Sequence, residues 1–334
     1  MIKAELIYNP HGGQVVVRHA LEVVVSFLTR NGWRVTYRET ARPEEATQLA
    51  RDAVRDGAEV VIAAGGDGTV SEVASGLVHT DTALGVLPVG TSNSWALQVG
   101  IPALNPLWPT SRIAKVVADI EERVNFSMPG SYYRRVLLDA AQVLVERHTV
   151  AVDVGEVAGR YFLMWAGIGL DAAVLGSVPP MEKAALGTWA YLITALGAAG
   201  RSSSPDVKLT LDGKKIEVNT QLIVVSNIQL YGGIMAIGSR AVVNDGKLDV
   251  CIFKGDGFFT FAQHALKVFS HQHLRDPSTE YYQCGEIVIE SSHALPVHVD
   301  GEPFTQTPVT IRVLPSALNV IVPENAPGNL FGQS

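Results

Sequence analysis

The stretch VVIAAGGDGTVSEVASGL, residues Val60–Leu77, passes from an apolar run through a glycine-rich turn into a helix-like segment. The uninterrupted apolar run is typical of a strand that is buried on both faces. Glycines at its end let the backbone approach a ligand closely, and the N–H groups that open the following helix favour a phosphate. This stretch therefore predicts a phosphate-binding turn at a strand exit.

Asp67 lies among these glycines, and a carboxylate does not fit a passive phosphate cradle because it repels the ligand. It fits if a metal ion lies between the carboxylate and the phosphate, or if the carboxylate takes a proton from an attacking hydroxyl group. A tight strand–helix turn in which Asp67 is the N-cap is the plain structural alternative.

The flanking sequence repeats this organisation. Apolar strand patterns alternate with helical spacing over residues 4–8, 14–30, 33–39, 43–56, 59–64 and 84–88. Such alternation predicts a parallel sheet covered by helices, and ligands bind such sheets at the carboxyl ends of the strands. Two more glycine-rich polar exits, NPHGG at 9–13 and GTSN at 90–93, are expected at this same edge.

The second half of the chain has a different pattern. From about residue 148, many short alternating segments predict a mainly antiparallel β-sandwich, interrupted by helices near 181–199 and 258–272. The proline-rich stretch 103–135, with one helical patch at 112–122, is expected to be a linker or insertion. We therefore predict an α/β domain over 1–125, a second domain over 136–310, and a tail, 311–334, that packs back on the first.

Composition limits the function classes. The 334 residues are 47% hydrophobic and carry a net charge of −7, which suits two globular domains and argues against nucleic-acid binding. Two cysteines without metal-ligand spacing exclude a disulfide framework and favour a reducing compartment. No secretory signal is recognised, and the longest apolar run, 184–200, is interpreted as a core or interfacial helix. A cytoplasmic location, peripheral to the membrane, is expected.

Six motifs together resemble the diacylglycerol kinase catalytic family, which includes bacterial lipid kinases and the sphingosine and ceramide kinases. They are NPHGG, GGDGTVSEV, LPVGTSNSWA, AGIGLDAAV, NDGKLDV and VDGEPF, in the family's order from Ile2 to about Pro323. The resemblance implies an α/β domain like those of NAD kinases and phosphofructokinases, a β-sandwich domain, and ATP bound in the cleft between them. It also implies transfer of the γ-phosphate of ATP to the hydroxyl of a lipid alcohol, such as diacylglycerol or a sphingoid-type lipid.

The resemblance also implies roles for individual residues. The expected nucleotide-binding residues are Asn9, Thr40, Gly65, Gly66, Asp67, Gly68, Thr69, Val70, Ser71, Glu72, Gly90, Thr91 and Asn93. The expected catalytic residues are Asp67, Asp300 and Glu302, and either Asp300 or Glu302 accepts the proton of the lipid hydroxyl. On its own, VDGE reads more simply as a hairpin turn.

A structural Mg²⁺ site, with Ca²⁺ as another possible occupant, is implied at the NDG turn. Its ligands would be the Asp245 carboxylate and the carbonyls of Val242 and Lys247, with support from Asp153. A plain hairpin turn is the alternative there.

The sequence departs from the family pattern at Gln14, Ser94 and Met164, where the family has a basic residue, aspartate and asparagine. Two other functions stay open: an NAD kinase-like enzyme with a soluble substrate, and a catalytically weak regulator that binds nucleotide or lipid, which the departures at Ser94 and Gln14 motivate. Lipid is the expected partner, with transient membrane contact and a possible homodimer. An apolar stripe could bind the acyl chain of the lipid, although its side chains could equally belong to the ordinary core. It comprises Trp189, Tyr191, Leu192, Ile193 and Leu196.

Overall fold

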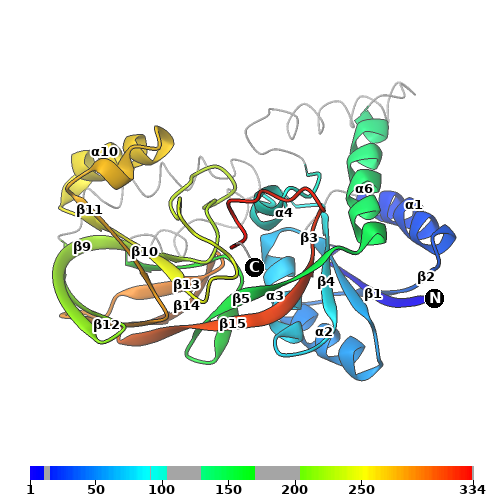
Figure 1. Cartoon of the computed structure of the whole chain (residues 1–334), viewed down its shortest axis with the longest axis horizontal. Helices are drawn as coiled ribbons and strands as arrows, with labels where there is room; N and C mark the ends of the chain where they lie inside the picture. The colour runs from blue at the N-terminus through cyan, green and yellow to red at the C-terminus, as the bar shows by residue number, and fades with distance from the viewer. Residues whose placement is uncertain (11–15, 91, 104–128, 170–203, 333–334) are drawn as a thin grey trace. The chain divides into compact units, whose positions relative to one another are not determined.

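The computed structural model describes residues 1–10, 16–90, 92–103, 129–169 and 204–332 (Figure 1). These residues form two compact units. The first contains Met1–Val152 and Ala317–Gly328, and the second contains Asp153–Ser316 and Asn329–Ser334. Strands β5 (Thr149–Val157) and β15 (Val309–Ile321) each run from one unit into the other.

The first unit is a parallel sheet with helices between its strands, as predicted. The strands follow the order β4-β3-β1-β2 and pair in parallel register. Their bounds are β1 Ile2–Tyr8, β2 Trp33–Glu39, β3 Val60–Gly65 and β4 Ala83–Pro88. Every residue of β3 and β4 is buried, as expected for central strands covered on both faces.

The helices of this unit are α1 Val16–Arg30, α2 Glu45–Arg55, α3 Asp67–Leu77, α4 Ser94–Val99 and α6 Pro129–Glu146. Helices α2 and α3 pack closely because Gly76 carries no side chain: a Cβ there would lie 2.6 Å from the Ala50 Cβ. Helix α6 lies beside α1 and contacts β4 (Figure 1).

The packing of α6 explains why the first unit extends beyond the predicted end at residue 125. Residues 129–135, placed by the sequence in an insertion, and 136–146, placed in the second domain, together form this helix. It packs on the first sheet, where the side chain of Leu144 lies against Gly85 of β4. The tail is also divided, since 317–328 belong to the first unit and 311–316 and 329–334 to the second.

The second unit is the predicted antiparallel sandwich. Besides β5 and β15 it contains β6 Arg160–Phe162, β7 Trp165–Gly169, β8 Asp206–Leu211, β9 Lys214–Ser226, β10 Leu248–Lys254, β11 Thr279–Cys284, β12 Glu286–Ser291, β13 Pro296–Val299 and β14 Glu302–Gln306. The long strand β9 belongs to both sheets. Its first half pairs with β8, and its second half pairs with β7 and β10.

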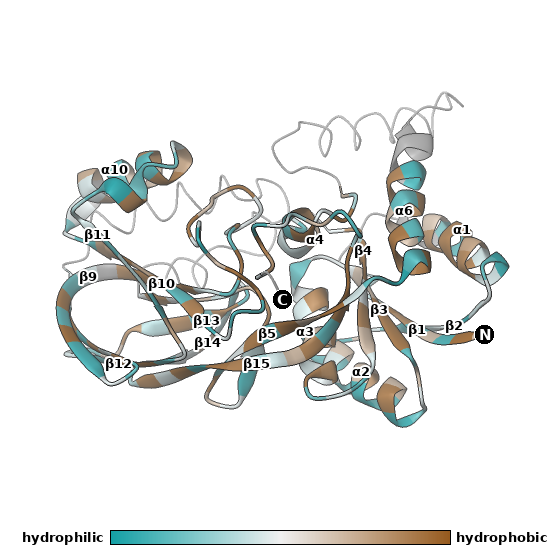
Figure 2. Cartoon of the chain, viewed as in Figure 1, coloured by the Kyte–Doolittle hydropathy of each residue, from teal (hydrophilic) through white to brown (hydrophobic). Residues whose placement is uncertain are grey.

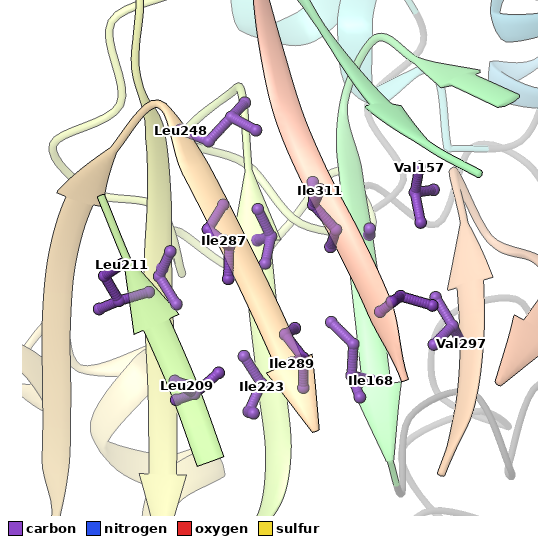
Figure 3. Packing of buried hydrophobic residues seen from close by; sticks show 14 of the residues in the cluster. Val157, Ile168, Leu209, Leu211, Ile223, Leu248, Ile287, Ile289, Val297 and Ile311 are labelled. Carbon is purple, nitrogen blue, oxygen red and sulfur yellow. The ribbon is translucent and has the colours of Figure 1, made fainter. Parts of the chain in front are cut away.

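Aliphatic side chains from both sheets meet in one core, which includes Ile168, Ile223, Ile287 and Ile311 (Figure 3). The second predicted helix near 258–272 is α10 (Gly257–Phe269), followed by the short 3₁₀ helix η1 (His273–Arg275). The helices expected at 112–122 and 181–199 lie outside the described residues, as does the apolar stripe of 189–196.

No helix in the described part of the chain is both long enough and apolar enough to cross a membrane.

Candidate active site

The glycine turns that follow β3 and β4 lie against each other. A Cβ on Gly90 would lie 2.3 Å from the Cα of Gly66, and the N–H of Val89 donates to the carbonyl of Gly65 at 3.2 Å. Backbone contact this close requires glycine, because any side chain would collide with the neighbouring turn. The structure thus brings these two predicted exits together at one edge of the sheet.

The first two strands end at the same edge. Tyr8 of β1 pairs with Glu39 of β2 and with Ala64 of β3, so that Asn9 and Thr40 directly follow paired strand ends. Thr40 is buried, and its N–H donates to the carbonyl of Tyr8 at 3.0 Å. Gln14 and Thr91 lie outside the described residues.

Asp67 is the first residue of helix α3, but its carboxylate binds the start of helix α4, after the glycine turn that follows β4. One carboxylate oxygen accepts a hydrogen bond from the Ser94 hydroxyl at 2.9 Å, and the other accepts one from the N–H of Trp95 at 3.3 Å. The N-cap of α3 is Gly66, so the alternative in which Asp67 caps its own helix is wrong. Burial raises the pKa of Asp67, and the hydrogen bonds from Ser94 and Trp95 oppose that rise.

The side chain of Asn93 closes its own turn. Its amide oxygen accepts from the N–H of Gly90 at 3.1 Å, and its amide nitrogen donates to the carbonyl of Gly90 at 2.8 Å. Asn93 has φ 49°, a left-handed conformation that asparagine tolerates. The predicted nucleotide residue therefore shapes the loop through a side chain that is itself buried.

Glu72 lies one turn into α3 and reaches helix α2. Its carboxylate accepts from the N–H of Ala46 at 3.1 Å, and its carbonyl accepts from the Thr47 hydroxyl at 2.8 Å. A carboxylate at a helix start satisfies backbone donors that lack a helical partner. Glu72 therefore ties α2 to α3 behind the glycine turn.

Asp300, in the second unit, binds three consecutive backbone N–H groups with its carboxylate. Its carboxylate accepts hydrogen bonds from the N–H groups of Leu163, Met164 and Trp165, at 2.9, 3.0 and 2.9 Å. Asp300 is buried, and its own N–H donates to the carbonyl of Trp165. The carboxylate thus fixes the chain between β6 and β7, including Met164, one of the positions that depart from the family pattern.

Glu302, two residues later, is 43% exposed and forms an ion pair with Arg160. The guanidinium of Arg160 also lies over the ring of Phe304, 5.1 Å from its centroid. This geometry separates the two acidic candidates: Asp300 is committed to the backbone, whereas the carboxylate of Glu302 is accessible and held by a cation.

Sequence reasoning missed Arg160, although a signal was present. VAGR at 157–160 and VDGE at 299–302 have the same form: valine, a small or acidic residue, glycine, then a charged residue. In both, the two central residues have positive φ, 49° and 79° in the first turn and 46° and 85° in the second. Each tight hairpin turn therefore presents the charge that follows it.

The predicted metal turn is held by Asp153, as expected. Its carboxylate accepts from the N–H of Gly246 at 2.6 Å and from that of Ser316 at 2.8 Å. Burial raises the pKa of Asp153, and Asp245 adds to the rise. Asp245 is exposed and one of its oxygens accepts from the N–H of Lys247 at 3.0 Å.

No group of three or more histidine, cysteine, aspartate or glutamate side chains suited to a metal ion occurs in the described ranges. The implied ligand set contains one carboxylate and two carbonyls, so it does not depend on such a group. A hard cation bound to one carboxylate, carbonyls and water fits the donor chemistry of this turn.

Two family models match the chain in sequence. The model of the diacylglycerol kinase catalytic domain matches residues 3–122, and that of the YegS C-terminal NAD kinase beta sandwich-like domain matches residues 165–322. The chain is 27% identical over 326 residues to a diacylglycerol kinase of Bacillus subtilis (strain 168), with 97% of each chain covered. It is 24% identical to a diacylglycerol kinase of Staphylococcus carnosus (strain TM300), covering 97% of this chain and 96% of that one.

A similar fold occurs in the crystal structure of a candidate diacylglycerol kinase from Bacillus anthracis (str. Sterne). The TM-score is 0.76 at 25% identity, and the match covers 96% of this chain and 95% of that one. The matches follow the order of the two units and extend along nearly the whole length. The chain belongs to the diacylglycerol kinase catalytic-domain family.

Proposed function

We propose that this chain is an ATP-dependent lipid kinase that phosphorylates the hydroxyl group of diacylglycerol or a related lipid alcohol. The observation that carries this proposal is the family match across both units, because it joins a phosphate-binding domain to the domain with the acidic turn. The named relatives act on diacylglycerol, which makes it the first substrate to test.

The glycine edge of the first unit is the proposed phosphate site. Gly65, Gly66 and Gly90 carry no side chains, which lets the two turns pack closely, and the first N–H groups of α3 have no helical acceptor. Asp67 is a positioning residue in this proposal, because Ser94 and Trp95 already occupy its carboxylate.

The serine at position 94, where the family has aspartate, is compatible with an active kinase. Its hydroxyl donates to Asp67, so the two turns stay joined without a second carboxylate at that point. An aspartate in its place would put two acidic groups in contact at a buried position, which needs a proton or a cation between them. The weak-regulator alternative therefore loses Ser94, one of the two departures that motivate it, and the other, Gln14, lies outside the described residues.

Glu302 is the proposed general base. As the lipid oxygen attacks the γ-phosphorus, the hydroxyl proton passes to the Glu302 carboxylate and the bond to the β-phosphate oxygen breaks, which gives ADP and the phosphorylated lipid. Arg160 positions this carboxylate, and Asp300 fixes the turn that carries it. The proposal requires the glycine edge and Glu302 to act on the same γ-phosphate.

A kinase of this family uses ATP and a divalent metal, and we propose Mg²⁺ as that metal. When bound to ATP, it neutralises charge on the transferred phosphoryl group. We also propose that Asp245 and the carbonyls of Val242 and Lys247 hold a structural cation, Mg²⁺ or Ca²⁺.

The proposal is tested by following transfer of labelled γ-phosphate from ATP to diacylglycerol, ceramide, sphingosine and NAD in parallel. We expect label in a lipid and none in NAD. Glu302→Gln should lower kcat about 10²-fold or more, the usual contribution of a general base. Glu286→Gln is the matched control, because Glu286 also pairs with an arginine on an exposed strand, at 2.7 Å. Label in NAD, or equal activity of both variants, would overturn the proposal.

A further inference from the structure

Between β6 and β7 the chain runs through the interior of the second unit after its ladder with β5 has ended. The last pair of that ladder is Gly155 with Phe162, and a continued ladder would place Asp153 opposite Met164. Leu163 and Met164 are buried, so their backbone N–H and carbonyl groups need partners that the ladder no longer provides. Groups from other parts of the chain must therefore bind this segment.

Two residues bind all six backbone groups of Leu163, Met164 and Trp165. The carboxylate of Asp300 accepts from the three N–H groups, and the N–H of Asp300 donates to the carbonyl of Trp165 at 2.9 Å. Asn227 binds the other two carbonyls. Its backbone N–H donates to Met164 at 2.8 Å, and its side-chain amide donates to Leu163 at 2.9 Å.

The side-chain amide of Asn227 also reaches β5. Its nitrogen donates a second hydrogen bond, at 2.8 Å, to the carbonyl of Asp153. One NH₂ group thus joins β5 to Leu163 where the direct ladder has ended. The reversed amide would put its oxygen against two carbonyl oxygens, so the two acceptors fix which atom is nitrogen. The amide oxygen is buried and accepts no hydrogen bond within the described residues, so the side chain acts here as a donor.

The burial of Asn227 is unlike that of other polar residues on these strands. Hydrophobic and hydrophilic residues are mixed along the strands of the second unit (Figure 2), and the hydrophilic residues of β12, for example, are exposed or half-buried. Asn227 directly follows β9 and is 1% exposed. Burial of an amide is unfavourable unless the amide is hydrogen-bonded, so the two bonds that it donates decide whether this packing is stable.

The segment that Asn227 holds carries both attachments of the acidic turn. Arg160, the first residue of β6, forms the ion pair with Glu302. Asp300 is attached through the N–H groups of residues 163–165. A shift of this segment relative to β5 would therefore move the guanidinium and the Asp300 contacts together, and with them the carboxylate of Glu302.

We propose that Asn227 is a positioning residue for Glu302, because its amide holds the segment to which the acidic turn is attached. This inference rests on the proposed function, in which Glu302 takes the proton of the lipid hydroxyl. Asn227 acts through Leu163 and Asp300 and touches none of the reacting atoms.

Hydrogen exchange tests the attachment without any activity. In Asn227→Ala, the amides of residues 160–165 and 299–306 should exchange at least about ten-fold faster, because the segment and the turn attached to it open more often. Asn219→Ala is the matched control and should leave both ranges unchanged. Asn219 also lies on β9, and its amide also donates to a carbonyl, that of Ser204, at 2.7 Å.

Unchanged exchange over 299–306 in Asn227→Ala would overturn the proposal. If this variant does not fold, Asn227→Ser takes its place, because serine keeps one donor and removes less of the side chain.

Kinetics test the positioning itself. Asn227→Ala should lower kcat at least about ten-fold with little change in the KM for ATP, because a small displacement of a base lowers the rate steeply. Asn227→Asp keeps the shape of the side chain, but its carboxyl group donates only when protonated. Burial raises the pKa of such a group, so kcat relative to the unaltered protein should rise from about pH 9 to about pH 6.

Circular dichroism at each pH must show that Asn227→Asp stays folded. A ratio of kcat that does not change with pH, or a rise in KM alone, would overturn the positioning role.

The two experiments separate this inference from the proposed function. Faster exchange in Asn227→Ala, in a protein that phosphorylates no lipid, would disprove the kinase and leave the attachment of the acidic turn by Asn227 standing. Lipid phosphorylation that is as fast in Asn227→Ala as in the unaltered protein would overturn this inference and leave the kinase standing.

Discussion

At the scale of single residues, Asp67 and Asp300, each beside a glycine, hold neighbouring backbone segments in place through hydrogen bonds. Asp67 joins the turns after β3 and β4, and Asp300 joins two hairpins through three backbone N–H groups. In both cases the carboxylate satisfies donors that would otherwise be buried without an acceptor. The acidic side chain that is accessible and paired with a cation is Glu302.

Arg160 provides the sharpest test of how Glu302 is held. Arg160→Ala should lower kcat by about 10²-fold with little change in the KM for ATP, because a base displaced by about 1 Å loses its alignment. Arg160→Lys should recover part of the rate, and added guanidinium should recover part of it in Arg160→Ala. Arg312→Ala, which removes another arginine that pairs with a glutamate, should behave like the unaltered protein. A rise in KM alone would contradict the positioning role.

Asp300→Ala should mainly destabilise the second unit. Three N–H groups lose their acceptor in a buried turn, which costs roughly 3 kcal/mol or more. The urea midpoint of unfolding should fall accordingly, while Asp300→Asn, which keeps one acceptor oxygen, should fall less. Equal midpoints for the alanine variant and the unaltered protein would show that these hydrogen bonds contribute little.

At the scale of elements, the site in the first unit depends on how closely two strand–helix turns approach. Gly90→Ala would place a Cβ 2.3 Å from the Cα of Gly66, so one turn must move. We expect weaker ATP binding by calorimetry and lower thermal stability. Gly328→Ala is the control in the same unit, because a Cβ there meets nothing within 4 Å. Unchanged ATP affinity in Gly90→Ala would argue against the proposed phosphate edge.

The attachment of α10 should depend on pH. Burial alone would raise the pKa of Asp276, but hydrogen bonds from Lys267 and Ser278 outweigh it and lower the pKa from 3.8 to about 2. A carboxyl group with a lowered folded-state pKa stabilises the fold above its unfolded value, and this contribution is lost as pH falls. Stability should therefore decline from about pH 4 towards pH 2, and Asp276→Asn should lessen that decline in urea titrations.

Strand and helix types follow from local periodicity, and the bounds of β1 to β4, α1 and α2 agree with the sequence expectation to within two residues. Strands β11 and β14 lack the alternating pattern from which the strands of the second unit are predicted. The residues of β11 are mostly half-buried and do not alternate, and β14 contains Pro303, which argues against a strand by itself. Both pair with a neighbour that the sequence does identify, β10 and β13.

At the scale of the whole molecule, the chain is a member of a lipid kinase family, and the proposed phosphate-binding residues and the proposed base lie in different units. Removal of divalent cations with EDTA should abolish phosphotransfer, and added Mg²⁺ should restore it. If Asp245 also holds a structural cation, Mg²⁺ or Ca²⁺ should raise the Tm, and Asp245→Asn should remove that rise. A cation-dependent Tm that Asp245→Asn leaves intact would place the bound ion elsewhere.

The sequence by itself determined the fold class, the edge of the sheet where glycine turns gather, and the acidic turn of the second unit. These features depend on side-chain periodicity and turn chemistry, which are properties of short stretches of backbone. The tertiary structure decided which acidic group is accessible, what Asp67 contacts, and that α6 belongs to the first unit. Those outcomes depend on pairs such as Arg160 and Glu302, 142 positions apart, and only the packing of whole sheets brings such residues together.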